Sequence, residues 1–176
     1  FSTLIPAEPW LFDYYARTGY VTAFRYGKRT FTLPADGKDS FSPVPPTGIA
    51  WKFQTFTDYN EDIYCYLNRK MQERPCCLQH TEADFRVVLA DLELSEGYIF
   101  TLSDELGIAA LAVAYPDDTS SILHIGELLS DTPEAERLLF TYICQSMQTE
   151  ILHIVMPLTK GQPAFDLGMI RIIQAK

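Results

Sequence analysis

The chain has 176 residues, of which 47% are hydrophobic and 13% aromatic, and it carries a formal net charge of −9 at pH 7. This length allows one domain and part of another, and this apolar content argues against disorder. No run of about 18 apolar residues occurs, which excludes a membrane-spanning helix. A negative field repels nucleic-acid phosphates and anionic membranes, so we expect neither as a partner. Small molecules and proteins remain as possible partners.

The first part of the chain predicts a strand, a helix and a second strand. Residues 1–7 are typical of a strand, and residues 10–18 place their apolar side chains on one helical face. Residues 20–33, rich in β-branched and aromatic side chains, predict one long strand or a hairpin about Gly27. Residues 34–47 are crowded with Pro, Gly, Ser and Asp, and we interpret them as a linker.

Two helices are predicted after the linker. The first covers residues 58–73 and is capped by Thr57 or Asp58. The second covers residues 81–92, where Thr81 and the Asp three residues later resemble a capping box.

The rest of the chain predicts a meander of three antiparallel strands, a helix, and a strand parallel to the third strand of the meander. A last strand follows a loop that contains Gly and Pro. The expected strands are residues 97–102, 107–115, 121–128, 151–156 and 168–173, and the expected helix is residues 132–147.

This order of elements resembles the fold of the Gcn5-related N-acetyltransferases, an α/β (α+β) fold with a mixed, mostly antiparallel sheet flanked by helices. The stretches LIPAEPWLFDYYARTGY and GMIRIIQAK are its most specific parts, and they are similar to the tandem-domain, enhanced-intracellular-survival type. The resemblance implies a piece of a longer protein. Residues 1–33 would be the closing strand-helix-strand of a first domain, residues 34–47 a linker, and residues 48–176 a second domain.

The family binds the pyrophosphate of acetyl-CoA with a Gln/Arg-x-x-Gly-x-Gly/Ala turn, which is missing here. The equivalent stretch, GELLSDTPEAERLL, has Asp131 or Thr132 as the helix cap, Pro133 in the first turn, and the acids Glu134 and Glu136 beside it. A diphosphate at this helix end would meet like charge. We therefore expect the second domain to be a degenerate copy, and acetyl-CoA to bind the first domain of the parent protein.

The resemblance of YARTGY to the helix end of the family assigns the general-acid role to Tyr15. A phenol is protonated at neutral pH and can protonate a departing thiolate. The alternative is that Tyr14 and Tyr15 are core aromatics of an amphipathic helix. His124 and His153 have no nearby carboxylate in the sequence to orient them, so we expect core or edge histidines.

The four cysteines lack the density and spacing of a secreted disulfide scaffold, which favours a cytoplasmic protein. Cys76 and Cys77 with His80 suggest a metal, but structural zinc takes four ligands in paired short spacings, and no second pair is present. We expect no zinc.

The resemblance implies part of an N-acetyltransferase that moves acetyl from acetyl-CoA to an amine of a small molecule or peptide. This chain would be mainly scaffold, and inactive by itself. The alternative is a non-catalytic interaction or dimerisation module of the same fold, and assembly into a homo-oligomer stays open.

Overall fold

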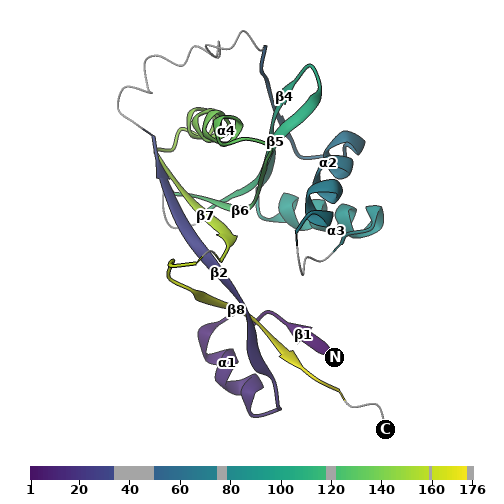
Figure 1. Ribbon diagram of the computed structural model, residues 1–176, viewed down its shortest axis with the longest axis vertical. Coiled ribbons are helices and arrows are strands. Elements are labelled where there is room, and N and C mark those ends of the chain that lie inside the picture. Colours follow the sequence, from purple (N-terminus) through teal and green to yellow (C-terminus); the bar gives the residue numbers. More distant parts are fainter. Residues whose placement is uncertain (34–49, 75–78, 118–121, 159, 174–176) are drawn as a thin grey trace. The chain divides into compact units, whose positions relative to one another are not determined.

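The computed structural model describes residues 1–33, 50–74, 79–117, 122–158 and 160–173, which form four helices and eight strands (Figure 1). Contacts divide the chain into two compact units. Unit 1 comprises Phe1–Arg29 and Val155–Lys176, and unit 2 comprises Thr30–Ile154.

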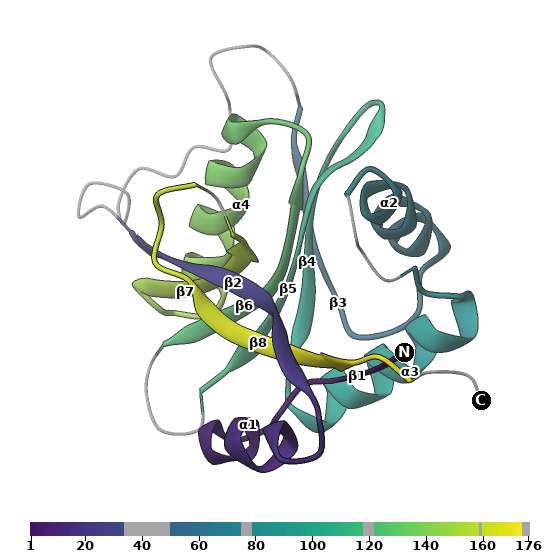
Figure 2. The same ribbon diagram turned by 60° about the horizontal axis from the view of Figure 1, so that its bottom comes forward.

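Unit 1 contains a small antiparallel sheet and one helix. Its elements are β1 (Ser2–Leu4), α1 (Pro9–Ala16), most of β2 (Val21–Thr32) and β8 (Phe165–Arg171). Strand β8 lies between β1 and β2 and pairs antiparallel with both (Figure 2). Thr3 of β1 and Val21 of β2 face the same residue of β8, Ile170, from opposite sides. The two early strands are therefore joined through β8.

Helix α1 has Pro9 in its first turn, where the missing N–H needs no partner. The chain leaves the helix through Gly19, whose φ of +88° lies in the left-handed region that favours glycine. None of the residues of α1 is buried, and Trp10 and Tyr14 expose 63% and 53% of their surface.

Unit 2 contains a mixed sheet. In spatial order its strands are the end of β2, then the first part of β7 (Ile151–Pro157), β6 (Leu123–Ser130), β5 (Gly107–Pro116), β4 (Tyr98–Asp104) and β3 (Lys52–Phe56). Strands β3 to β6 are antiparallel neighbours, whereas β6 and β7 run parallel. A parallel pair needs a crossover, which here contains helix α4 (Pro133–Ser146).

Helices cover both faces of this sheet, with α4 on one face and α2 (Glu61–Gln72) and α3 (Glu82–Leu94) on the other (Figure 2). Because side chains alternate along a strand, β4 serves two cores. Phe100 packs with the α4 side, and Ile99 packs with the side of α2 and α3. No helix in the described ranges is long and apolar enough to cross a membrane.

The predicted fold class, a mixed and mostly antiparallel sheet flanked by helices, is confirmed. The capping box of α3 is present: the Thr81 hydroxyl accepts from the Asp84 N–H, and the Asp84 carboxylate accepts from the Thr81 N–H. Residues 20–33 form one strand rather than a hairpin about Gly27.

Two local predictions were wrong. Helix α2 is capped by Asn60, whose side chain accepts from the Ile63 N–H at 3.1 Å, and not by Thr57 or Asp58. Strand β3 was not predicted, although WKFQTF largely alternates apolar and polar residues. The contacts place β8 in unit 1, together with the first strands of the chain. These two units therefore have other boundaries than the two domains expected from the sequence, and the domain assignment stays a prediction. The predicted linker lies outside the described residues.

Candidate functional site

Strands β6 and β7 are paired over a short distance only. Their parallel ladder covers Leu123 to Ile125 of β6. From Gly126 to Ser130, β6 has β5 on one side and no described strand on the other. An unpaired edge leaves main-chain N–H and C=O groups that need partners.

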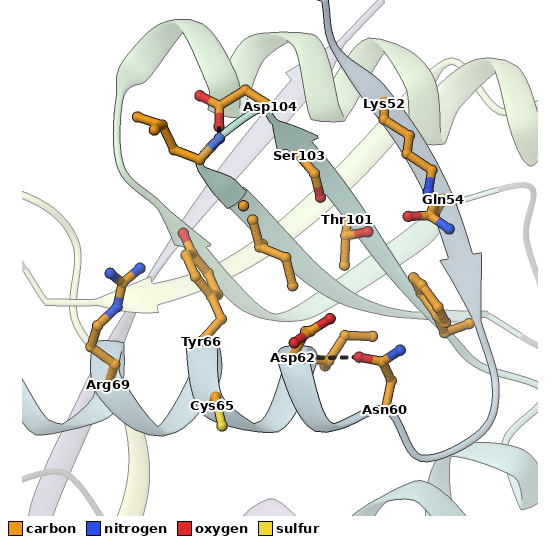
Figure 3. A pocket seen from close by; sticks show the side chains of 15 residues that line it. Lys52, Gln54, Asn60, Asp62, Cys65, Tyr66, Arg69, Thr101, Ser103 and Asp104 are labelled. Carbon is orange, nitrogen blue, oxygen red and sulfur yellow. Dashed lines mark hydrogen bonds between the residues drawn. The ribbon is translucent and has the colours of Figure 1, made fainter.

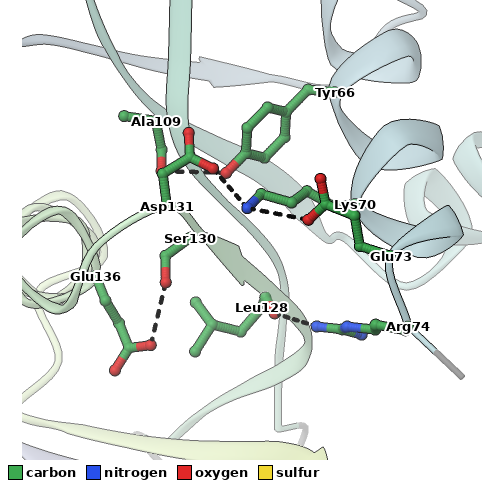
Figure 4. A network of polar contacts seen from close by, with 9 residues as sticks. All are labelled: Tyr66, Lys70, Glu73, Arg74, Ala109, Leu128, Ser130, Asp131 and Glu136. Carbon is green, nitrogen blue, oxygen red and sulfur yellow. Dashed lines mark hydrogen bonds and ion pairs between the residues drawn. The ribbon is translucent and has the colours of Figure 1, made fainter.

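At Leu128, two side chains bond the main-chain groups that no described strand pairs, and Figure 4 shows one of them, Arg74. The Glu127 carboxylate accepts from the Leu128 N–H at 3.1 Å, and the Leu128 carbonyl accepts from Arg74 Nη2 at 2.8 Å. Arg74 Nη1 also donates to Glu127 Oε1 at 2.7 Å. Both side chains are partly buried, with 27% and 29% of their surface exposed. At Leu128, the unpaired edge of β6 is therefore already bonded by the protein itself.

A second set of contacts joins α2 to the loop between β6 and α4. Lys70 of α2 forms an ion pair with Asp131 and a longer one, 3.6 Å, with Glu73. Nearby, the Tyr66 hydroxyl donates to the Ala109 carbonyl at 3.1 Å. Burial, and secondarily the Asp131 carboxylate, raise the pKa of Tyr66 well above its usual range, so this phenol stays protonated.

The N-terminus of α4, where a bound pyrophosphate would lie in the family, is occupied by local contacts. The Thr132 hydroxyl accepts from the Ala135 N–H at 3.1 Å, which confirms Thr132 as the cap. Glu134 and Glu136 lie in the first turn, and Ser130 Oγ donates to Glu136 Oε2 at 3.4 Å. A diphosphate here would meet two carboxylates at the positive end of the helix.

Tyr15 lies on α1 in unit 1 and is partly buried. Its ring makes edge contacts with Tyr14 and Tyr20, at centroid distances of 5.2 and 5.9 Å, and Tyr20 in turn shares a 2.8 Å hydrogen bond with the Ser2 hydroxyl. In the part of the chain that the structure describes, the Tyr15 hydroxyl has no hydrogen-bond partner. Tyr14 is exposed, so within the described residues it is not the core aromatic that the alternative interpretation expects.

His124 is oriented by a carboxylate, contrary to the sequence expectation. Its Nε2 lies 3.1 Å from Asp117 Oδ2, and its ring stacks on Tyr115 and meets His153 edge-on. Asp117 follows β5, and the antiparallel register that sets Tyr115 opposite His124 brings the carboxylate to the imidazole. Only the pairing of β5 with β6, not the distance along the chain, could have indicated this contact.

The described cysteines do not suggest a metal site. Burial raises the pKa of Cys144 to about 12, which keeps this thiol protonated, and Cys65 is exposed. Within the described ranges no group of three His, Cys, Asp or Glu side chains could hold an ion. Cys76 and Cys77 lie outside those ranges, so the absence of zinc stays a prediction.

The sequence matches no protein-family model and no curated protein. Solved structures do match. A GCN5-related N-acetyltransferase from Anabaena variabilis has a TM-score of 0.60 at 16% identity, over 96% of this chain and 44% of that one. A GCN5-related N-acetyltransferase from Kribbella flavida has a TM-score of 0.58 at 15% identity, over 96% of this chain and 42% of that one. Eis1 from Mycobacterium abscessus has a TM-score of 0.54 at 14% identity, over 97% of this chain and 46% of that one.

The chain spans less than half the length of these three structures. At such low identity the likeness shows the fold alone. It agrees with the helices on both faces of the sheet, the antiparallel strands β3 to β6 and the parallel pair that diverges after Ile125. The chain therefore has the fold of the GCN5-related N-acetyltransferases.

Proposed function

We propose that this chain is part of an N-acetyltransferase that transfers acetyl from acetyl-CoA to an amine of a small molecule or peptide. Residues 1–33 would close a first, catalytic domain, and residues 48–176 would form a second domain that serves mainly as scaffold. The fold supports the reaction class, and the short span relative to the similar structures supports a longer parent. A cytoplasmic location rests on the cysteine usage.

The edge of β6 carries the proposal that the second domain does not bind acetyl-CoA. A coenzyme arm entering between β6 and β7 would need the main-chain groups of Leu128, which already bond Arg74 and Glu127. Its phosphates would also approach the acids of the first turn of α4. Both effects oppose binding. The ion pair of Arg74 with Glu127 would have to break, and the phosphates would lie close to the carboxylates of α4.

Calorimetric titration of the 176-residue chain with acetyl-CoA tests this proposal. We expect no binding in the low micromolar range, because the edge groups and the helix end are both occupied. A dissociation constant of a few micromolar, about −8 kcal/mol, would contradict the scaffold role.

For the catalytic domain we propose Tyr15 as the general acid. It is partly buried, and within the described residues its hydroxyl is free to donate to a leaving thiolate. In the parent enzyme, Tyr15→Phe keeps the ring and removes the proton, so kcat should fall by about 10²- to 10⁴-fold with little change in melting temperature. Steady-state kinetics measure this, with Tyr14→Phe as the control. A Tyr15→Phe rate within about twofold of wild type would reject the assignment.

A non-catalytic interaction module is the second candidate, and exposed apolar side chains in unit 1 favour it. The large residues that expose more than half of their surface there are Phe1, Ile5, Trp10, Tyr14, Val21, Ile172 and Ile173. Exposed apolar side chains favour an interface where they form one continuous patch. If the module pairs with a second copy, light scattering will give a dimer mass for the chain. A monomer would leave the acetyltransferase parent as the better explanation of this surface.

A further inference from the structure

A cavity of about 720 Å³ opens at the surface of unit 2 (Figure 3), and no residue of β6 lines it. Its walls are α2, the paired strands β3 and β4, and the turn that joins β4 to β5. This volume is in the range of pockets for small molecules.

The register of β3 and β4 makes one wall of the cavity polar. Lys52 pairs with Ser103, and Gln54 pairs with Thr101, so four polar side chains stand in two cross-strand rows on the face toward α2. The same face becomes apolar one step further, at Phe56, which packs with the core under α2 and α3. The two polar rows therefore lie next to the apolar core under α2 and α3 and are not part of it.

Thr101 is the most buried polar residue of this wall. Only 1% of its surface is exposed, and its hydroxyl has no hydrogen-bond partner among the described residues. Figure 3 shows its side chain directed into the cavity. The hydroxyl is not an enclosed, unsatisfied group, because it reaches the open cavity, where water or a ligand can bond it. Thr101 therefore offers one hydrogen-bonding group to an occupant of the cavity.

Charges of both signs line the same cavity. Lys52 and Arg69 are the cations, and Figure 3 shows them at opposite ends with Asp62 between them. In the described parts of the chain, none of these three forms an ion pair. Asp104, the other carboxylate, accepts from the Leu106 N–H. A polyanion would meet the aspartates and a polyamine would meet the cations, so an occupant with charges of both signs fits best.

We propose that this cavity binds a zwitterionic molecule of the amino-acid or short-peptide class. Its ammonium group would face Asp62, its carboxylate would face Lys52, and its amide groups would bond Gln54 and Thr101. The inference is independent of acetyl transfer, because Tyr15 belongs to unit 1 and takes no part in the cavity.

Triglycine is a suitable probe because it carries one ammonium, one carboxylate and two amides. Titration of the full 176-residue chain, followed by NMR shifts of residues around the cavity, should show saturable binding of triglycine. N-acetyltriglycine lacks the ammonium and triglycine amide lacks the carboxylate, so each should bind at least about tenfold more weakly. Maltose, an uncharged polyol of similar size, should not compete.

Matched variants identify the site. Asp62→Asn should weaken triglycine binding about tenfold or more, whereas Glu61→Gln, in the same helical turn but outside the cavity, should not. Lys52→Met should act like Asp62→Asn, with the exposed Lys160→Met as its control. Thr101→Val should weaken binding by a few-fold without lowering the melting temperature, since no protein hydrogen bond is lost.

Several results would overturn the proposal. They are no shift with triglycine up to about 10 mM, equal affinity for N-acetyltriglycine or maltose, or unchanged affinity of Asp62→Asn. Circular dichroism of each variant separates lost binding from lost folding, and Thr101→Val gives a second test if a charge variant unfolds.

Discussion

Arg74 shows how one side chain replaces a whole strand contact. Its planar guanidinium donates from two nitrogens to two different acceptors, the Glu127 carboxylate and the Leu128 carbonyl. Lysine has a single ammonium and cannot reproduce this fork. The partial burial of this pair makes it a stronger contact than the exposed ion pair of Arg86 with Glu82 in the same unit.

Replacing Arg74 by Met should therefore lower the free energy of unfolding by about 1–3 kcal/mol, because Glu127 and the Leu128 carbonyl lose their partner in a partly buried place. Urea denaturation followed by circular dichroism measures the loss. Arg86→Met is the control, since Arg86 pairs with Glu82 where both side chains are more than half exposed, and it should cost less than about 1 kcal/mol. Equal losses in the two variants would mean that the β6 edge gains nothing from Arg74.

Residue-level contacts were hard to predict from the sequence. The contact of His124 with Asp117 depends on the register of β5 with β6, and that of Arg74 with Leu128 joins a helix end to a strand far along the chain. Thr132 and its acids were predictable, because a helix cap is a local pattern of a few residues.

At the scale of secondary-structure elements, the start of one helix was predicted correctly and the start of another was not. The box of α3 was predicted because Thr81 and Asp84 have the required spacing. Before α2, three residues that can cap a helix stand within four positions, Thr57, Asp58 and Asn60. The local pattern does not choose among them, and in the structure Asn60 is the cap.

The box of α3 also predicts a dependence of stability on pH. Hydrogen bonds from the Thr81 side chain and main chain hold the pKa of Asp84 below its ordinary value of 3.8. A carboxylate with a lowered folded-state pKa stabilises the fold above its unfolded-state pKa, and this contribution is lost as the pH falls through the folded-state value.

Asp84→Asn should consequently lower the melting temperature at pH 7, and the difference from wild type should shrink as the pH falls below about 4. Differential scanning calorimetry across this pH range measures it. Glu93→Gln, near the other end of α3 and outside the capping box, is the control variant. A constant difference at all pH values would mean that the Asp84 charge does not contribute.

On the scale of the whole molecule, strand partners close in the sequence were predictable and distant ones were not. Helices and most strands follow from local periodicity, and the parallel placement of β7 follows from its crossover helix. The position of β8 between β1 and β2 depends on pairing between residues almost a full chain length apart, such as Ser2 with Arg171. No local pattern encodes such a partner.

A chain shortened to end at Leu158 tests the role of β8. Within unit 1, β1 and β2 lose the strand that pairs with both, so their amides should lose protection from hydrogen exchange. Strands β4 and β5 should keep theirs, because their partners lie within unit 2. A chain that ends at Arg171 retains β8 and is the control. Equal loss of protection in both units would show that they unfold together.

The place of β8 also has a consequence for biosynthesis. When β1 and β2 leave the ribosome, the strand that will join them has not been translated, since β8 comes after every strand of unit 2. Unit 2 can complete its sheet first, as domains commonly do during synthesis. A ribosome stalled before residue 165 would therefore carry a folded unit 2 and a unit 1 in which β1 and β2 still lack their shared partner.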